Sequence, residues 1–144
     1  MDIRALEVSD YHQGFFELLQ QLTTAPKPTQ EVFCNALQTL SPNELIFVAV
    51  EDGHVIGTIK LILETKFIHS CQSVLHIEDL VVDSLHRQRG IASTLLTQAL
   101  LVARRSNIYK VILNCSPELQ SFYSKFGFSA HGLQMALYNK DVVY

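Results

Sequence analysis

The sequence predicts one α/β domain in which helices flank a β-sheet, and two patterns support this prediction. Two β-rich runs, Leu45–Val50 and Val55–Leu63, surround the turn Glu51-Asp52-Gly53, an arrangement typical of an antiparallel hairpin. From Arg89 to about Arg105, apolar residues recur at i, i+3, i+4, i+7, i+8 and i+11, which is the period of an amphipathic helix. A chain of 144 residues is long enough for one compact domain and too short for two ordinary ones. We therefore expect residues 1–144 to form a single domain.

The first forty residues predict a strand and two helices. Ile3–Leu6 is a short strand candidate. Ser9 or Asp10 can cap a helix whose apolar stripe runs to Leu22. A Thr- and Pro-rich stretch then breaks that helix, and Thr29 can cap a second helix that ends near residue 40.

The second half of the chain predicts further strands and a short helix. Leu75–Val82 and Tyr109–Asn114 are rich in β-branched residues and are expected to be strands. Pro117 suits the first turn of a short helix that reaches Phe126, with Gly127 as a candidate C-cap. The remaining segment, Phe128–Tyr138, suggests a final strand or hairpin.

Composition and spacing argue against several classes of partner. The net charge is −3 and no Lys/Arg cluster is longer than two, so nucleic acid is not expected as a general partner. The cysteines Cys34, Cys71 and Cys115 contain no CxxC pair, and the six histidines show no HxxxH or HExxH spacing, so no metal site is expected. No apolar run approaches the ~20 residues of a membrane span, and the N-terminus does not resemble a signal peptide. These features predict a soluble, cytoplasmic protein with no membrane partner.

The most informative segment is the loop after the expected strand 75–82, where Arg87-x-x-Gly90-x-Ala92 opens the amphipathic helix. A helix start leaves about four main-chain N–H groups without internal partners and places partial positive charge there. Small residues at Gly90 and Ala92 let a ligand approach the main chain, and Arg87 and Arg89 add charge, which together suit a pyrophosphate. The segment is neither a Walker A loop nor GxGxxG. On spacing alone, a glycine-containing helix start with solvated arginines is an equally good interpretation.

Three segments together resemble a known family. The segment 87–92, Arg-Gln-Arg-Gly-Ile-Ala, resembles the [QR]xxGx[GA] motif of the GNAT superfamily of N-acetyltransferases. The segment 76–83 resembles that superfamily's fourth strand, and the segment 121–128 resembles its FYxKxGF signature. The resemblance implies the GNAT fold: a single mixed, mostly antiparallel central sheet flanked by helices, with a splayed pair of strands that holds acetyl-CoA.

More narrowly, the chain is similar to the glucosamine 6-phosphate N-acetyltransferases. The segments 22–24, 66–69, 76–79 and 109–113 support this similarity. It implies transfer of the acetyl group of acetyl-CoA to the amine of D-glucosamine 6-phosphate, by direct attack in a ternary complex, as a step toward UDP-N-acetylglucosamine. It also implies a homodimer, because the similar enzymes build their sugar pockets across a two-fold interface.

The resemblance also implies roles for particular residues. Main-chain groups of one strand would bind the pantetheine arm and thioester, and the helix start would bind the pyrophosphate; with Tyr123, these cofactor-binding residues are Leu80, Val81, Val82, Gln88, Arg89, Gly90, Ile91, Ala92 and Ser93. Tyr123 would protonate the leaving thiolate, and Glu78 and Asn114 are the other catalytic candidates. The expected substrate contacts are Thr23, Lys66, Phe67, Ile68, His69, Glu78, Asp79, Tyr109 and Lys110.

Two positions depart from the narrower group. Asn114 stands where the sugar-phosphate enzymes carry an acidic residue, and an amide cannot take up a proton. Tyr138 stands where they place an arginine for the phosphate, although Lys140 is a possible substitute. Glu78 and Asp79 are neighbours on a strand, so at most one of them is expected to face the pocket directly. Two alternatives therefore stay open: acetylation of another amine, such as a peptide, lysine or polyamine, or a non-catalytic acetyl-CoA-binding module.

Overall fold

The computed structural model describes residues 1–141, which fall into two compact units: residues 1–113 and the residues from 114 onward. The first unit contains the sheet and three helices, and the second contains one short helix and the C-terminal segment. The family-like segments 76–83 and 87–92 lie in the first unit, whereas the segment 121–128 lies in the second. A single domain over residues 1–144 stays a prediction.

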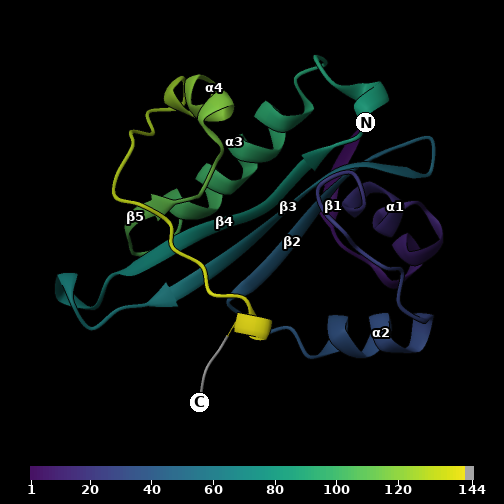
Figure 1. The fold of residues 1–144 in the computed structure, drawn as a ribbon, viewed down its shortest axis with the longest axis horizontal. Coiled ribbons are helices and arrows are strands. Elements are labelled where there is room, and N and C mark those ends of the chain that lie inside the picture. The colour runs from purple at the N-terminus through teal and green to yellow at the C-terminus, as the bar shows by residue number, and fades with distance from the viewer. Residues whose placement is uncertain (142–144) are drawn as a thin grey trace. The chain divides into compact units, whose positions relative to one another are not determined.

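The first unit is built on an open five-stranded sheet (Figure 1). The strands lie in chain order: β1 (Asp2–Ala5), β2 (Glu44–Glu51), β3 (His54–Thr65), β4 (Ser73–Val82) and β5 (Ile108–Ile112). Every neighbouring pair is antiparallel except β4 and β5, which are parallel. The predicted mixed, mostly antiparallel sheet flanked by helices is therefore confirmed.

The predicted hairpin is formed by β2 and β3. Asp52 and Gly53 both have positive φ, 50° and 75°, which is the requirement of the two-residue turn whose twist matches that of the flanking strands. Because Asp and Gly are among the residues that tolerate this conformation best, the residue types at positions 52 and 53 were enough to predict the turn.

Helices cover both faces of this sheet. On one face, α1 (Phe15–Leu19) and α2 (Gln30–Gln38) bury Phe15, Phe33 and Val48 in one apolar cluster. The next residue along β2, Ala49, lies 3.5 Å from where a Cβ on Gly57 would stand, beside side chains of α3 (Ile91–Arg104). Successive residues of a strand point to opposite faces, so α3 covers the other face.

The start of the first predicted helix is wrong. Neither Ser9 nor Asp10 caps α1, which begins after Gly14 at φ 89°; residues Val8–His12 form a separate 3₁₀ turn, η1. Asp10 is fully buried and its carboxylate accepts two hydrogen bonds from Arg4, at 2.7 and 2.8 Å, because a buried charge needs a partner. The cap of the second helix is confirmed, since Thr29 Oγ1 accepts a hydrogen bond from the main-chain N–H of Val32 at 3.3 Å.

The second unit contains a 3₁₀ turn, η4 (Pro117–Leu119), followed directly by α4 (Gln120–Ser124). The aromatic rings of this unit pack on one another: Phe122 and Tyr123 are 5.0 Å apart between centroids, and Tyr123 and Phe128 are 6.0 Å apart. Gly127, at φ 92°, follows the helix in the left-handed conformation expected after a helix end.

The predicted final strand or hairpin over Phe128–Tyr138 is wrong. These residues have no strand conformation, and the segment ends in the 3₁₀ turn η5 (Asn139–Asp141). Leu133, Met135 and Leu137 are 94%, 91% and 69% exposed, so their alternation does not form a buried strand face. A strand needs the main chain of a second strand as its hydrogen-bonding partner, and alternation alone does not supply one.

Within residues 1–141 no helix combines the length and the apolar character needed to cross a bilayer.

Candidate functional site

Strand β4 bends near its end because it contains one extra residue relative to β3. Lys60 faces Glu78 and Thr58 faces Val81, so Asp79 and Leu80 together oppose a single residue of β3. Asp79 takes up the irregularity with φ at 51°, in the left-handed region. Such a bulge bends the strand and re-aims its main chain.

The pairing of β4 with β5 stops before this bulge. Its last pair is His76 with Ile112, the last residue of β5, so Leu80–Val82 have no strand partner on the β5 side of the sheet within the described residues. The pairing thus ends as the predicted splay of the two strands requires. The side chains of Val81 and Val82 are buried and that of Leu80 is half-buried, so at Val81 and Val82 a ligand can reach only the main chain. Unpaired N–H and C=O groups along a strand edge suit a ligand with amides of its own.

The connection from β4 to α3 leads into an uncapped helix start. It passes through a 3₁₀ turn, η3 (Ser84–His86), and then through Gln88 and Gly90, which have φ of 63° and 78°. Gly90 is the N-cap of α3 and makes no side-chain capping bond; the first helical bond runs from Thr94 N to Gly90 O at 2.9 Å. The N–H groups of the first turn, residues 91–93, are therefore those that a helix leaves without internal acceptors.

A glycine in β3 fixes the place of this helix start. A Cβ on Gly57 would meet Ile91 Cγ2 at 3.0 Å and Leu95 Cδ1 at 3.1 Å, so only glycine lets the first turns of α3 approach β3 this closely. Ile91 is 2% exposed and anchors that turn in the core. Of the predicted cofactor residues, Ile91 can therefore contribute only its main-chain N–H. Gly57 is a residue that the motifs missed, although a glycine inside a strand is a known sign of close approach.

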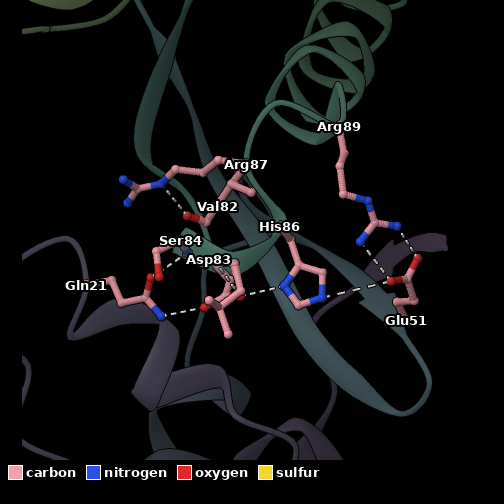
Figure 2. Close-up of polar contacts among 9 residues, drawn as sticks. Gln21, Glu51, Val82, Asp83, Ser84, His86, Arg87 and Arg89 are labelled. Atoms are coloured by element: carbon pink, nitrogen blue, oxygen red, sulfur yellow. Dashed lines mark hydrogen bonds and ion pairs between the residues drawn. The ribbon is translucent and has the colours of Figure 1, made fainter.

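The charge at the turn differs from the sequence expectation. The Arg89 guanidinium makes two hydrogen bonds to Glu51 at the end of β2, at 2.8 and 3.0 Å (Figure 2). This pair lowers the pKa of Glu51 and raises that of Arg89. Arg87 instead points away from Arg89 and donates through Nε to the main-chain oxygen of Val82 at 3.3 Å. The positive charge of Arg89 is thus largely offset, and the main-chain amides remain as the anion-binding element together with the exposed guanidinium of Arg87, whose partner is a neutral carbonyl.

The loop before the turn is tied to both neighbouring elements. Gln21, just after α1, donates to Asp83 Oδ1 at 2.7 Å, and Asp83 Oδ2 in turn faces His86 Nδ1 (Figure 2). The Gln21 hydrogen bond and then that of His86 hold the pKa of Asp83 below its ordinary value. His86 Nε2 lies 3.9 Å from Glu51, which completes a polar chain from α1 to β2. In the described part of the chain, no group of three or more His, Cys, Asp or Glu residues could hold a metal ion.

The predicted substrate residues of the β3–β4 connection lie beyond the other end of β4. Lys66 pairs with Glu64 at 3.1 Å, and Glu64 also accepts from His76 at 2.9 Å, which lowers the pKa of Glu64. The ring of His69 stacks on that of Tyr109 with centroids 3.6 Å apart and an interplanar angle of 5°. The structure therefore brings two of the predicted substrate residues together.

The same connection is exposed and has unusual backbone conformations. Phe67 and Ile68 are 91% and 62% exposed. His69, Ser70 and Cys71 all have positive φ, at 54°, 57° and 61°, a conformation that residues with a Cβ adopt at an energetic cost.

Thr23 lies far from this connection. It follows Gln21, whose partner Asp83 comes directly after β4, whereas His69 comes before β4 begins. A strand of ten residues spans about 30 Å, so one chain does not bring Thr23 and His69 into one pocket.

Glu78 and Asp79 lie between the two ends of β4, and Lys110 is exposed on β5. Glu78 and Asp79 would face opposite sides of a regular strand, but the bulge at Asp79 interrupts that alternation.

The second unit contains the remaining catalytic candidates. Tyr123 is 7% exposed, and burial, followed by the charge of Cys115, raises the pKa of its phenol above the ordinary value of 10.0. Tyr123 is therefore a protonated donor at neutral pH. Asn114 and Lys140 are exposed, and Tyr138 is 69% exposed.

These features, a bulged and splayed strand followed by an uncapped helix start, are those of an acyl-CoA-dependent transferase. The chain belongs to the acetyltransferase (GNAT) family, whose model matches residues 11–128. Membership makes the chain an acetyltransferase, and the family implies acetyl-CoA as co-substrate.

Its relatives are more specific. The chain is 40% identical over 141 residues to glucosamine 6-phosphate N-acetyltransferase 1 of Oryza sativa subsp. japonica, a match that covers 94% of this chain and 86% of the relative. It is 34% identical over 143 residues to glucosamine 6-phosphate N-acetyltransferase 1 of Dictyostelium discoideum, covering 96% and 90%. The crystal structure of glucosamine-6-phosphate N-acetyltransferase from Arabidopsis thaliana superposes with a TM-score of 0.92 at 36% identity, covering 96% of this chain and 97% of that one.

Proposed function

We propose that this chain transfers the acetyl group of acetyl-CoA to the amine of D-glucosamine 6-phosphate, by direct attack of the amine in a ternary complex. The observation that most supports the substrate is the set of relatives of that name, which match nearly the whole chain at 34–40% identity. The splayed end of β4 and the uncapped start of α3 support the acetyl donor.

In this proposal the main chain binds the donor. The amides of residues 88–93 hold the pyrophosphate, because an anion at a helix start meets free N–H groups and a favourable dipole. The main-chain groups of Leu80–Val82 that β3 and Arg87 leave unpaired bind the pantetheine arm and orient the thioester. The buried side chains of Val81 and Val82 support this division, since they leave only the main chain to the ligand.

Tyr123 is proposed as the group that protonates the leaving thiolate. Its raised pKa keeps the phenol protonated over the neutral range, so it is available as an acid. The amine must reach the site without its proton, and Glu78 is the carboxylate among our catalytic candidates that could take that proton, directly or through water. Asn114 is proposed to orient the amine by accepting a hydrogen bond.

The sugar site is proposed to form between two copies of the chain. Thr23 and His69 lie beyond opposite ends of β4, a strand that spans about 30 Å, and a two-fold axis that reverses one chain relative to the other would bring the two sets together. The exposed, alternating Leu133, Met135 and Leu137 are the proposed apolar part of that homodimer interface. Sedimentation velocity tests this assembly, and a monomer that turns over the sugar phosphate would exclude it. A cytoplasmic location remains a prediction from the sequence alone.

The substrate is tested by measuring CoA release with glucosamine 6-phosphate, glucosamine, a lysine peptide and spermidine. The expected result is the highest kcat/KM with glucosamine 6-phosphate. A preference for the peptide or polyamine would support acetylation of another amine, the alternative that Asn114 and Tyr138 keep open.

Catalysis is separated from mere binding by Tyr123→Phe. Loss of an acid group is expected to lower kcat by about a hundredfold or more, while affinity for CoA stays unchanged. Phe122→Leu is a matched control, because it alters the adjoining ring of the same unit without removing a hydroxyl. If both variants turn over like the unmodified chain, Tyr123 is not the acid.

A further inference from the structure

Gln21 belongs to none of the sequence motifs, yet its side-chain amide joins two elements more than sixty residues apart. Its Nε2 donates to Asp83 Oδ1 at 2.7 Å, and its Oε1 accepts from the main-chain N–H of Ser84 at 2.9 Å. Gln21 follows α1, and both partners follow β4 directly (Figure 2). One amide thus connects a helix to the first residues of the loop that leads to the helix start at Gly90.

The two oxygens of Asp83 have separate tasks. Oδ1 accepts from Gln21, whereas Oδ2 accepts from the main-chain N–H of Leu85 at 3.2 Å and faces His86 Nδ1. Asp83 is the N-cap of η3, so Oδ2 holds the turn together locally. The bond from Gln21 therefore adds an external attachment without competing with the loop's own cap.

The loop needs such attachments because part of it is unfavourable on its own. Only four residues separate η3 from α3, and one of them, Gln88, has a left-handed φ of 63°, whereas Gly90, at 78°, adopts that region without cost. A residue with a Cβ adopts this region only when its surroundings require it. On the far side the loop is held by Glu51 through Arg89 and His86, and on the near side by Gln21.

We infer that Gln21 is a positioning residue for acetyl-CoA binding: by fixing residues 83 and 84, its amide holds the free amides of residues 91–93 in the geometry that grips the pyrophosphate. The inference rests on the proposed function, since it takes the start of α3 as the pyrophosphate site. Gln21 itself touches no reacting atom and acts through the loop.

The geometry allows an exchange of donor and acceptor between the two residues. Gln21→Glu removes the donor and sets a carboxylate against Asp83, and Asp83→Asn removes the charged acceptor. When both substitutions are combined, the asparagine introduced at position 83 can present its NH₂ at the former Oδ1 position and donate to the carboxylate introduced at position 21. The oxygen of that asparagine, at the former Oδ2 position, still caps η3, and the carboxylate at position 21 keeps an oxygen for the N–H of Ser84. The double variant therefore restores the connection with its direction reversed.

Three readouts test the inference: the Kd of CoA by calorimetry, the split between KM for acetyl-CoA and kcat, and the melting temperature. Each single variant is expected to weaken CoA binding about fivefold to tenfold and to raise KM, with kcat within about twofold of the unmodified chain. The double variant is expected to return to within about twofold. Gln72→Ala is the matched control, because Gln72 makes a long-range amide bond to Asn107 at 3.3 Å beyond the other end of β4 and is expected to leave the Kd unchanged.

The outcomes are distinguishable. The inference is overturned if the single variants bind CoA as well as the unmodified chain does. It is also overturned if the double variant folds but does not recover CoA affinity, or if the single variants lower the melting temperature while the Kd of CoA stays constant. If the unmodified chain does not bind CoA, the proposed function fails first and the inference with it. Should Gln21→Glu not fold, Gln21→Ala tests the same bond without added charge. A higher Kd for CoA is again expected, and an unchanged Kd would again contradict the inference.

Discussion

The loop that precedes α3 and the β3–β4 connection lie beyond opposite ends of β4, and they differ in what holds them. Residues 83–93 are fixed by long-range hydrogen bonds with Gln21 and Glu51 and by the buried side chain of Ile91. Residues 66–72 expose Phe67 and Ile68 and contain three successive left-handed residues. The chain therefore organises its proposed donor site by itself, whereas its proposed sugar site needs contacts from a ligand or a second chain.

The physical origin of the difference is the presence or absence of an apolar anchor. Gly57 lets Ile91 and Leu95 approach β3, so the start of α3 cannot shift without opening the core. The β3–β4 connection instead relies on the exposed stack of His69 on Tyr109 and on the Lys66–Glu64 pair, and exposed contacts of this kind contribute little. Variants in the two regions should accordingly affect different substrates.

The largest effect is expected from Ala92→Glu. A carboxylate in the first turn of α3 favours the helix, because negative charge suits the positive end of the dipole. The same charge would repel a pyrophosphate at about 4–5 Å, which corresponds to roughly 3 kcal/mol or about a hundredfold in Kd. Calorimetry with CoA and a melting curve measure both effects.

Leu101→Glu provides the control for Ala92→Glu. It adds the same charge on the exposed part of α3, about 13 Å further along the helix and beyond one Debye length, so the Kd should not change. An equal loss of CoA affinity in the two variants would show that the net charge of the chain, rather than charge at the helix start, governs binding.

A smaller effect, on the other region, is expected from Lys66→Ala. Loss of one ammonium that can reach the sugar phosphate should raise KM for glucosamine 6-phosphate about tenfold, and the CoA affinity should stay the same. Steady-state kinetics with glucosamine as the second amine complete the test, because glucosamine has no phosphate and its KM should not change.

Lys27→Ala is the matched control for this variant, because Lys27 forms a similar pair with Glu17 at 3.0 Å. An equal rise of KM in both variants, or a rise for glucosamine too, would remove Lys66 from the phosphate site.

Arg89→Ala is expected to weaken CoA binding about fivefold, close to the Gln21 variants, because it removes the attachment of the same loop to Glu51. The guanidinium is committed to Glu51 and offers little to a phosphate itself, whereas an additional direct bidentate contact would bring the total loss to about thirtyfold or more. Titrations with CoA at two salt concentrations measure this, with Arg104→Ala at the other end of α3 as the control. A loss of about thirtyfold would mean that Arg89 leaves Glu51 for the ligand.

The smallest effect concerns acid stability. The pKa of Asp83 is lowered in the folded chain, so its contribution to stability is complete above the ordinary Asp value of about 3.9 and is lost as the pH falls through the folded-state value. Between about pH 5 and pH 3 the melting temperature of the unmodified chain should therefore fall more steeply than that of Asp83→Asn. Parallel curves would contradict the shift.

The features that the sequence predicted correctly depend on neighbouring residues. The Asp52-Gly53 turn, the Thr29 cap and the repeat that forms α3 are each encoded within a few positions. The errors arose where distant groups decide. Asp10 is held by Arg4 in a buried pair instead of capping a helix, and the alternation in residues 128–138 has no strand to pair with in the described chain.

The same distinction applies to the site. The free amides at the start of α3 follow from a local motif around Gly90, and the splay follows from the family resemblance. Glu51 could not be predicted, because its bond to Arg89 spans 38 residues, and Gln21 could not either, because its partner lies 62 residues away. Only the folded sheet brings these side chains to the loop.

The most direct test compares the affinities of CoA, dephospho-CoA and 4′-phosphopantetheine by calorimetry. If free main-chain amides at residues 91–93 grip two linked phosphates, dephospho-CoA should bind within about tenfold of CoA, and 4′-phosphopantetheine, which has one phosphate, about a hundredfold more weakly. Binding of 4′-phosphopantetheine as tight as that of CoA, or no binding of any of the three, would contradict the account.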